Sequence, residues 1–294
     1  MGTVLLALAI PLLAGVASGS AGSTSLPQGA GTRWSRAAPG FEFRVMDGGP
    51  LCRKGSHAVA VARIEPSRWR IEPFSYTEDP NGRGNFAREP LDIEAWRKRT
   101  GAAIVFNAGQ YSTDRIPMGL FVKEGRNLGS SQIKAWKGLL VAEPMGPSKG
   151  RGRRAARATI LDLEHERFAL STTPYRVVVQ SFMLLDRDGK KRVRRSDWLA
   201  NRTVVAVDRR GRLLVLHTEG AWSLWDFGDW IAHSGLGVRQ AMAMDGGFES
   251  QMSVRSGATV YLSYGQWHID DRGDHSIPGL KVNLPAVIGL FPRK

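Results

Sequence analysis

The run MAMDGGFESQM at residues 242–252 is the stretch around which the chain is organised. Its apolar part ends abruptly in Asp245, and Gly246 and Gly247 follow. Such a run indicates a buried strand, although four apolar residues alone are also compatible with a helix. Paired glycines let the backbone approach a ligand closely. We therefore expect Asp245 at a strand end, where open sheets of α/β folds place ligands; a tight turn with a solvated Asp is the alternative.

The same order of an apolar strand, a polar residue and a glycine occurs earlier in the chain. Residues 102–106, AAIVF, are predicted to form a buried strand that ends in Asn107, and Gly109 follows. A helix is predicted just before it at residues 92–100, with Asp92 as its N-cap and a glycine after its last turn.

The remaining pattern predicts many short strands and one further helix. Alternation of apolar and polar residues and short apolar runs give strands at 57–64, 68–74, 118–122, 137–142, 175–186, 203–207, 212–217, 257–263 and 281–289. We expect the first two to pair with each other, and 203–207 to form a hairpin with 212–217. The second helix, 224–234, begins at Ser223 as N-cap. The predicted fold class is α/β, in the α+β sense, with a mixed, largely antiparallel sheet system and few helices.

Charge and cysteine content narrow the classes of partner. The chain of 294 residues carries 41 Lys and Arg against 27 Asp and Glu, a net charge of +14. This balance favours an anionic partner: nucleic acid, a membrane surface or an acidic polymer. The single cysteine excludes an internal disulfide, and zinc-site spacing of Cys and His is absent from the sequence.

The N-terminal sequence suggests export. Residues 4–17 are apolar over the length of a signal-peptide core, and small residues follow at 17–22. The basic residues expected before such a core are missing, so an uncleaved anchor or a simple helix is the alternative. We expect a signal peptide at 1–22, a linker at 23–40 and one domain at 41–294. A periplasmic or secreted bacterial protein with no membrane span after cleavage has little access to nucleic acid and more to envelope polymers.

Two polar segments allow other functions. The basic run SKGRGRRAAR at 148–157 could bind nucleic acid, but no aromatic residues are interleaved to stack bases, so a solvated hairpin loop is favoured. The segment HIDDRGDH at 268–275 leaves a bound divalent cation open, with a solvated loop as the simpler interpretation.

Six short motifs, taken in order over residues 57–291, resemble the phosphodiester glycosidase family, which includes an animal enzyme that removes N-acetylglucosamine from phosphodiester-linked mannose. They are NAGQY at 107–111, GLFVKEG at 119–125, Gln180, NRTVVAVD at 201–208, Gly211-Arg212 and DGG at 245–247. Phe248 and Glu249 depart from the pattern, which commonly has glycine and then small hydroxyl residues. The resemblance implies an activity on sugar phosphodiesters, and bacterial members are often labelled exopolysaccharide biosynthesis proteins.

The chemistry of a sugar 1-phosphodiester favours particular residues. The leaving phosphate monoester needs a cation to balance its charge more than it needs a proton. Arginine is suited to this through bidentate contacts. We therefore expect Arg202, Asp245 as nucleophile or base, and an assisting Glu219 to be catalytic, with Arg115 as a second cation. A structural salt bridge is the alternative for Arg202.

Further residues complete the predicted site. Asn107 and Gln180 would hydrogen-bond sugar hydroxyls or phosphate, or else cap strand ends through their amides. Gly246, Gly247 and Glu249 are expected to line the substrate site. The predicted function is an exported hydrolase that cleaves a phosphate-linked envelope glycan. The alternative is a non-catalytic binder of anionic glycans, with Phe248 and Glu249 as the change that disabled catalysis.

Overall fold

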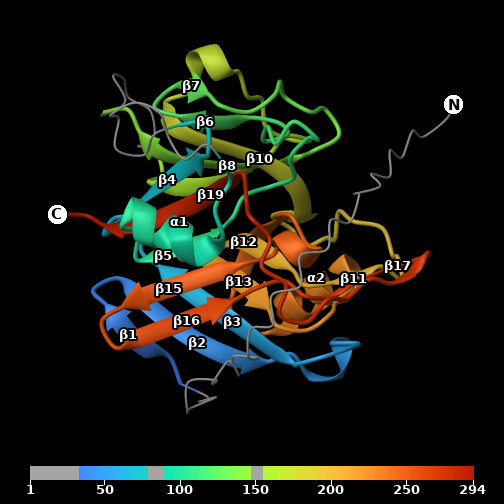
Figure 1. Ribbon diagram of the computed structural model, residues 1–294. Helices are drawn as coiled ribbons and strands as arrows, with labels where there is room; N and C mark the ends of the chain where they lie inside the picture. Colours follow the sequence, from blue (N-terminus) through green and yellow to red (C-terminus); the bar gives the residue numbers. More distant parts are fainter. Residues whose placement is uncertain (1–32, 79–88, 147–154) are drawn as a thin grey trace, which may run out of the picture.

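A computed structural model describes residues 33–78, 89–146 and 155–294 (Figure 1). The predicted signal peptide, most of the linker and most of the basic run lie outside the described residues. Every pairing between described strands is antiparallel, so the sheet system is not mixed. The two described helices, α1 (Ile93–Thr100) and α2 (Leu224–His233), are short. Neither has the length and apolar character needed to cross a bilayer.

Three sheets contain all the described strands. The first has the order β1 (Ser35–Ala38), β2 (Phe41–Asp47), β3 (Ala58–Ile64), β13 (Leu213–Thr218), β12 (Thr203–Asp208), β14 (Val238–Ala243), β10 (Tyr175–Leu185), β6 (Phe121–Lys123) and β7 (Arg126–Asn127), with β8 (Gly138–Pro144) on β10 and β9 (Ala158–Asp162) on β8. The second has the order β16 (Thr259–Ser263), β15 (Met252–Ser256), β5 (Ile104–Asn107), β19 (Ala286–Pro292) and β4 (Trp69–Ser75). The third joins β11 (Leu199–Ala200), β17 (His268–Asp270) and β18 (Gly273–Asp274).

The first two sheets pack face to face and a helix covers the outer face of each. Alternate residues of β12 point to opposite faces, as in any strand. Val205 belongs to the core shared with Phe106 and Ile288 of the second sheet, whereas Val204 packs with Phe227 of α2. Burial on both faces explains why β12 is an almost continuous apolar run rather than an alternating one.

The second sheet is covered by α1 through a smaller apolar cluster that contains Trp96 and Val287. Local signals predicted this helix well. The Asp92 carboxylate accepts hydrogen bonds from the backbone of Glu94 at 2.9 Å and Ala95 at 3.1 Å, and Gly101 ends the helix with φ +70°. Ser223 caps α2 in the same way, and β12 forms the predicted hairpin with β13.

One predicted strand pairing and two predicted element boundaries were wrong. β4 pairs with β19 rather than with β3, because the turn after Ile64 carries the chain from the first sheet to the second. The predicted linker at 23–40 is too long, since Ser35–Ala38 form β1 on the edge of the first sheet. The last strand begins at Ala286 rather than at residue 281.

Candidate active site

The segment that follows β14 carries the chain from the first sheet to the second, where β15 begins. Met244 still donates its backbone N–H to the carbonyl of Thr203 in the first sheet, at 2.9 Å. Asp245 donates instead to the carbonyl of Ala108 beyond β5, at 3.2 Å. Asp245 therefore lies at the seam between two antiparallel sheets. Its position comes from this crossing of the chain between sheets, and not from the strand ends of a parallel sheet.

Asn107 ties this seam together from the end of β5. Its buried side chain donates from Nδ2 to the carbonyl of Asp245 at 2.9 Å and to that of Ala108 at 3.1 Å. Its Oδ1 accepts from the backbone N–H of Gln251 at 3.2 Å. Both amide atoms thus bind backbone, so Asn107 positions Asp245 and Gln251. These bonds correspond to the structural alternative considered for Asn107.

Arg202 approaches the same point from the start of β12. Its Nε donates to the carbonyl of Trp222 at 2.8 Å, and its Nη2 donates to the carbonyl of Trp198 at 2.9 Å. Burial lowers the pKa of Arg202 to about 10, which the nearby Asp245 charge opposes, so the guanidinium remains cationic at neutral pH. Two carbonyl groups, rather than a salt bridge, hold this side chain in place and leave its Nη1 directed at Gly246.

The two glycines of the motif have different physical requirements. Gly246 has φ −117°, which any residue can adopt, but a Cβ there would lie 3.0 Å from Arg202 Nη1 and 3.0 Å from the carbonyl oxygen of Asn201. Gly247 has φ +72°, and its Cβ would lie 2.9 Å from His268 Nδ1. Close approach therefore selects glycine at the first position, and backbone conformation together with close approach selects it at the second.

Asp245 and Glu249 are two carboxyl groups that act on each other electrostatically. Glu249 ends the 3₁₀ turn Gly247–Glu249, so the turn brings its side chain back towards Asp245. Burial and the Glu249 charge raise the pKa of Asp245 well above its usual range, while the backbone N–H of Gly246 and the Arg202 charge act in the opposite direction. Burial also raises the pKa of Glu249. Like charges in a poorly solvated site favour a state in which the pair keeps a proton.

Tyr111 is a member of this site that the sequence did not single out. Its hydroxyl donates to Glu249 Oε1 at 3.2 Å. Burial, followed by the charges of Glu249 and Asp245, raises the pKa of Tyr111, so the phenol remains a donor. Its signals in the sequence were its position four residues after the end of β5 and its place in the motif NAGQY. Arg115 is exposed in the adjoining loop and acts electrostatically on Tyr111, which places this predicted second cation at the edge of the site.

Two predicted site residues have other partners. Gln180 Oε1 accepts from the backbone of Leu120 at 3.3 Å and Ile133 at 3.0 Å, and its Nε2 donates to the carbonyls of Ile133 and Trp136, both at 2.8 Å. These four bonds use the hydrogen-bonding capacity of the Gln180 amide within the protein, which corresponds to the structural alternative considered for it. The Glu219 carboxylate accepts a hydrogen bond from the Ser56 hydroxyl at 3.2 Å. Burial raises the pKa of Glu219.

Asn201 was matched only as part of a motif, yet it joins three segments. Its Oδ1 accepts from the backbone of Gln266 and Trp267, both at 2.8 Å, and its Nδ2 donates to the carbonyl of Thr218 at 2.8 Å. Its own carbonyl accepts from Gly247 at 3.0 Å. Asn201 therefore fixes the turn that contains both glycines.

Among residues 33–78, 89–146 and 155–294, the histidines have other roles than metal binding with the acidic residues. His217 is buried within β13, and burial lowers its pKa to about 3. His268 stacks on Phe248 with ring centroids 5.7 Å apart, and Asp270 binds Arg272 at 2.8 Å. Within the described part of the chain, no three His, Cys, Asp or Glu side chains are arranged to hold a metal ion.

Comparison with known proteins gives one match by sequence and several by structure. A family model described as phosphodiester glycosidase matches residues 100–279. The catalytic domain of zebrafish N-acetylglucosamine-1-phosphodiester alpha-N-acetylglucosaminidase, solved in a form auto-inhibited by its pro-peptide, is similar with a TM-score of 0.57 and 12% identity, covering 87% of this chain and 85% of that one. A hypothetical protein from Synechocystis has a TM-score of 0.56 and 13% identity, covering 87% of this chain and 63% of that one. No curated protein matches by sequence. At these identities the two structures show a shared fold.

Proposed function

This chain belongs to the phosphodiester glycosidase family, whose model matches more than half of it, and from this premise we propose that it hydrolyses the bond between an anomeric carbon and a phosphate. The observation that carries the proposal is the arrangement at the sheet seam. A half-buried guanidinium, held by two carbonyls, faces the residue next to a carboxyl group of raised pKa. The site therefore offers a fixed cation beside a group that can take up or give a proton.

The proposed reaction uses these groups as follows. Arg202 Nη1 contacts an oxygen of the phosphodiester and balances the charge that develops as the C1–O bond breaks. A water molecule forms the new bond to C1, and its proton passes to the carboxylate of the Asp245–Glu249 pair. The phosphate monoester leaves with the electron pair of the broken bond. Tyr111 holds Glu249 in place through its hydroxyl, and Asn107 holds the backbone of Asp245.

The substrate class and location are also part of the proposal. A phosphate-linked envelope glycan or exopolysaccharide suits a basic protein with net charge +14. The apolar residues 4–17 support export to the periplasm or the medium. N-terminal sequencing of protein recovered outside the cytoplasm should give a start between about residues 17 and 25; protein that still begins at Met1 would contradict cleavage.

The test of the activity is release of free sugar from a nucleoside-diphosphate sugar and from a phosphodiester-linked glycan. Asp245→Asn keeps the shape and the hydrogen bond from Gly246, but it should reduce turnover at least ~10²-fold. Asp271→Asn, an exposed acidic residue on the β17–β18 turn, is the matched control and should leave turnover unchanged. Glycan binding with no turnover by the wild-type protein would favour the non-catalytic binder instead.

A further inference from the structure

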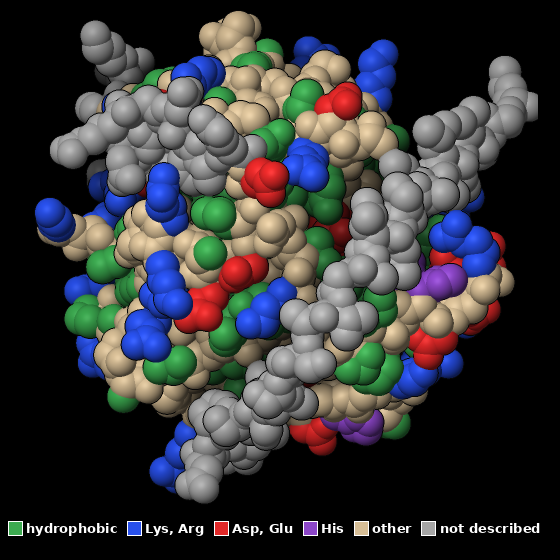
Figure 2. All heavy atoms as spheres, viewed as in Figure 1, with side chains coloured by type: hydrophobic (Ala, Val, Ile, Leu, Met, Phe, Trp, Pro, Cys, Tyr) green, Lys and Arg blue, Asp and Glu red, His purple; other side chains and the backbone are tan. Residues whose placement is uncertain are grey.

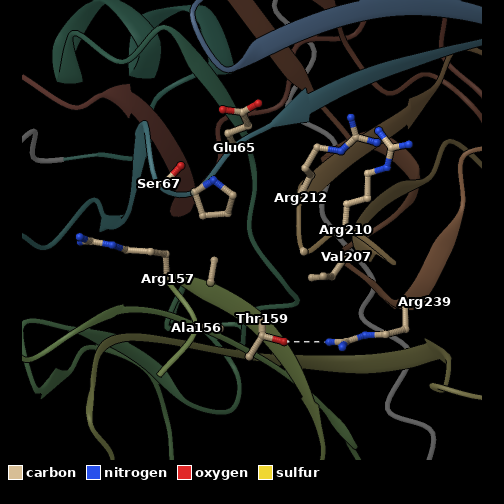
Figure 3. Close-up of a pocket in the computed structure, with 12 residues that line it drawn as sticks. Glu65, Ser67, Ala156, Arg157, Thr159, Val207, Arg210, Arg212 and Arg239 are labelled. Carbon is tan, nitrogen blue, oxygen red and sulfur yellow. Dashed lines mark hydrogen bonds between the residues drawn. The ribbon is translucent and has the colours of Figure 1, made fainter. Parts of the chain in front are cut away.

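A second charged region lies at the other end of the strands that carry the site. The hairpin between β12 and β13, the start of β14, the start of β9 and the turn before β4 surround a cavity of about 560 Å³ (Figure 3). We call it the arginine cavity; its lining includes Glu65, Arg157, Thr159, Arg210, Arg212 and Arg239. Arg202 precedes β12 and Arg210 follows it, so the six residues of this strand separate the two regions by roughly 20 Å.

The arginine cavity has more positive charge than its surroundings neutralise. Among the described residues, only Arg212 of the four lining arginines has carboxylate partners within 4.0 Å: Asp208 at 2.7 Å and Glu42 at 4.0 Å. Glu65 forms its ion pair with Arg68 at 3.2 Å. Arg239 Nη2 donates to the Thr159 hydroxyl at 3.3 Å, which leaves its charge unbalanced.

The turn that presents two of these arginines is held rigidly. The buried Asp208 accepts hydrogen bonds at Oδ1 from the backbone of Arg210 and of Arg212, both at 2.9 Å. Its Oδ2 binds Arg212 Nε at 2.7 Å. Figure 3 shows Arg210 and Arg212 on one side of the cavity and Arg239 reaching across it towards Thr159, while Arg157 is turned outward on the opposite side.

The lining indicates the chemistry of the ligand. Guanidinium groups on fixed backbone suit oxyanions, and phosphate above all, through paired N–H donors. None of the twelve described lining residues is aromatic, so stacking of nucleic-acid bases has no platform here. On the face shown in Figure 2, Lys and Arg are interspersed with Asp and Glu. We propose that the arginine cavity is a second, non-catalytic site that binds phosphate groups of an anionic glycan.

The identity of this glycan rests on the proposed function, whereas phosphate binding does not. If the glycan is the polymer whose phosphate-linked sugar is released, the arginine cavity holds the chain at a distance from the cleaved bond. Its contribution should then appear in KM for the polymer and not in turnover of a small substrate.

The experiment compares the wild-type chain with R210Q/R239Q and with R167Q/R255Q. The control pair removes the same charge from exposed arginines that do not line the cavity. Inorganic tripolyphosphate is titrated by calorimetry at low and at higher NaCl. We expect at least ~10-fold weaker binding and a smaller salt dependence for R210Q/R239Q, with the control pair unchanged. Equal weakening in both variants would overturn the proposal, since it would reduce the effect to net charge.

Two further measurements separate this proposal from the catalytic one. The KM for a phosphodiester-linked polymer should rise in R210Q/R239Q while kcat/KM for a nucleoside-diphosphate sugar is unchanged. A chain without any turnover that still binds tripolyphosphate through these arginines would contradict the proposed function and support the arginine cavity. Tighter binding of single-stranded DNA than of the phosphate-bearing polymer, lost in R210Q/R239Q, would overturn the glycan assignment.

Discussion

The side-chain amide of Asn107, in the second sheet, donates a 2.9 Å hydrogen bond to the backbone carbonyl of Asp245 at the end of the first. This bond and the one from Asp245 N to Ala108 O couple the position of the candidate catalytic carboxyl to the packing of the two sheets. Stability and activity should therefore depend on the same contact.

Asn107→Ala tests this coupling. The substitution leaves the carbonyl of Asp245 and the N–H of Gln251 without their side-chain partner in a buried region, which should cost about 2 kcal/mol or more. Urea unfolding should show this loss, and sugar release should fall in the temperature range where the variant is still folded. Full activity in a destabilised variant would show that the Asn107–Asp245 hydrogen bond contributes to stability and not to catalysis.

Arg202→Lys keeps the charge but loses the planar fork. A lysine ammonium cannot reproduce the Nε and Nη2 bonds to two carbonyls and still direct a third donor at Gly246. We expect kcat/KM for a sugar phosphodiester to fall at least ~10-fold. Arg53→Lys, at an exposed ion pair with Asp226, is the control. Unchanged kinetics would make Arg202 a purely structural residue.

Gly246→Ala should displace the Arg202 guanidinium without replacing any titratable side chain. The new Cβ would lie 3.0 Å from Nη1 and from a backbone oxygen that cannot easily move. Activity should drop at least ~10-fold, as small misplacements at reacting groups commonly cost. Gly228→Ala in α2, where the new Cβ would lie 3.3 Å from Leu184 Cδ1 and away from the site, is the control and should leave activity unchanged. An active Gly246→Ala enzyme would show that the guanidinium position is not critical.

Tyr111→Phe should change the pH profile rather than the fold. The hydroxyl lowers the pKa of Glu249 by donating to its carboxylate, so its removal should raise that pKa further. The acidic limb of the kcat/KM profile should therefore move to higher pH. Tyr175→Phe, in a separate apolar cluster, is the matched control. Identical profiles for Tyr111→Phe and wild type would place Tyr111 outside the titrating group.

Asp245→Asn should also alter the pH dependence of stability. A carboxyl whose folded pKa is raised binds its proton more tightly in the folded state, so the free energy of unfolding falls as the pH rises from the unfolded pKa through the folded one. Removing Asp245 removes this loss, and it removes the repulsion that Glu249 experiences. Urea unfolding at pH 4.5 and pH 7.5 should show a smaller decrease for the variant. A larger decrease would mean that the Arg202 contact dominates.

Local signals predicted the features that depend on neighbouring residues. Each of these features depends on about ten residues of sequence. They are the helix caps at Asp92 and Ser223, the β12–β13 hairpin and the end of the apolar run at Asp245. The pairing of β4 could not be predicted from local signals, because its partner β19 lies more than 200 residues further along the chain. The predicted partner β3 and the observed partner β19 are both apolar strands, and only tertiary packing decides which of them pairs with β4.

The part of the site that lies close together in the sequence was predicted, and the part that depends on long-range packing was not. Asp245, Gly246 and Glu249 lie within one turn of each other, so the motif brought them together. Gln180 resembled a binding residue because an amide in a buried strand needs partners, but its partners are backbone groups of Ile133 and Trp136. Tyr111 needed the position of Glu249, 138 residues away, to be recognised.

The position of β19 has a consequence for how the protein is made. This strand lies between β5 and β4, although it follows both of them and every other described strand in the sequence. The sheet that supplies Asn107 stays split until residues 286–292 leave the ribosome and insert between strands made much earlier. Long-range closure of this kind is slow. A nascent chain therefore lacks the closed sheet from which Asn107 holds Asp245, and the protein acquires its complete site only after synthesis of these strands is finished.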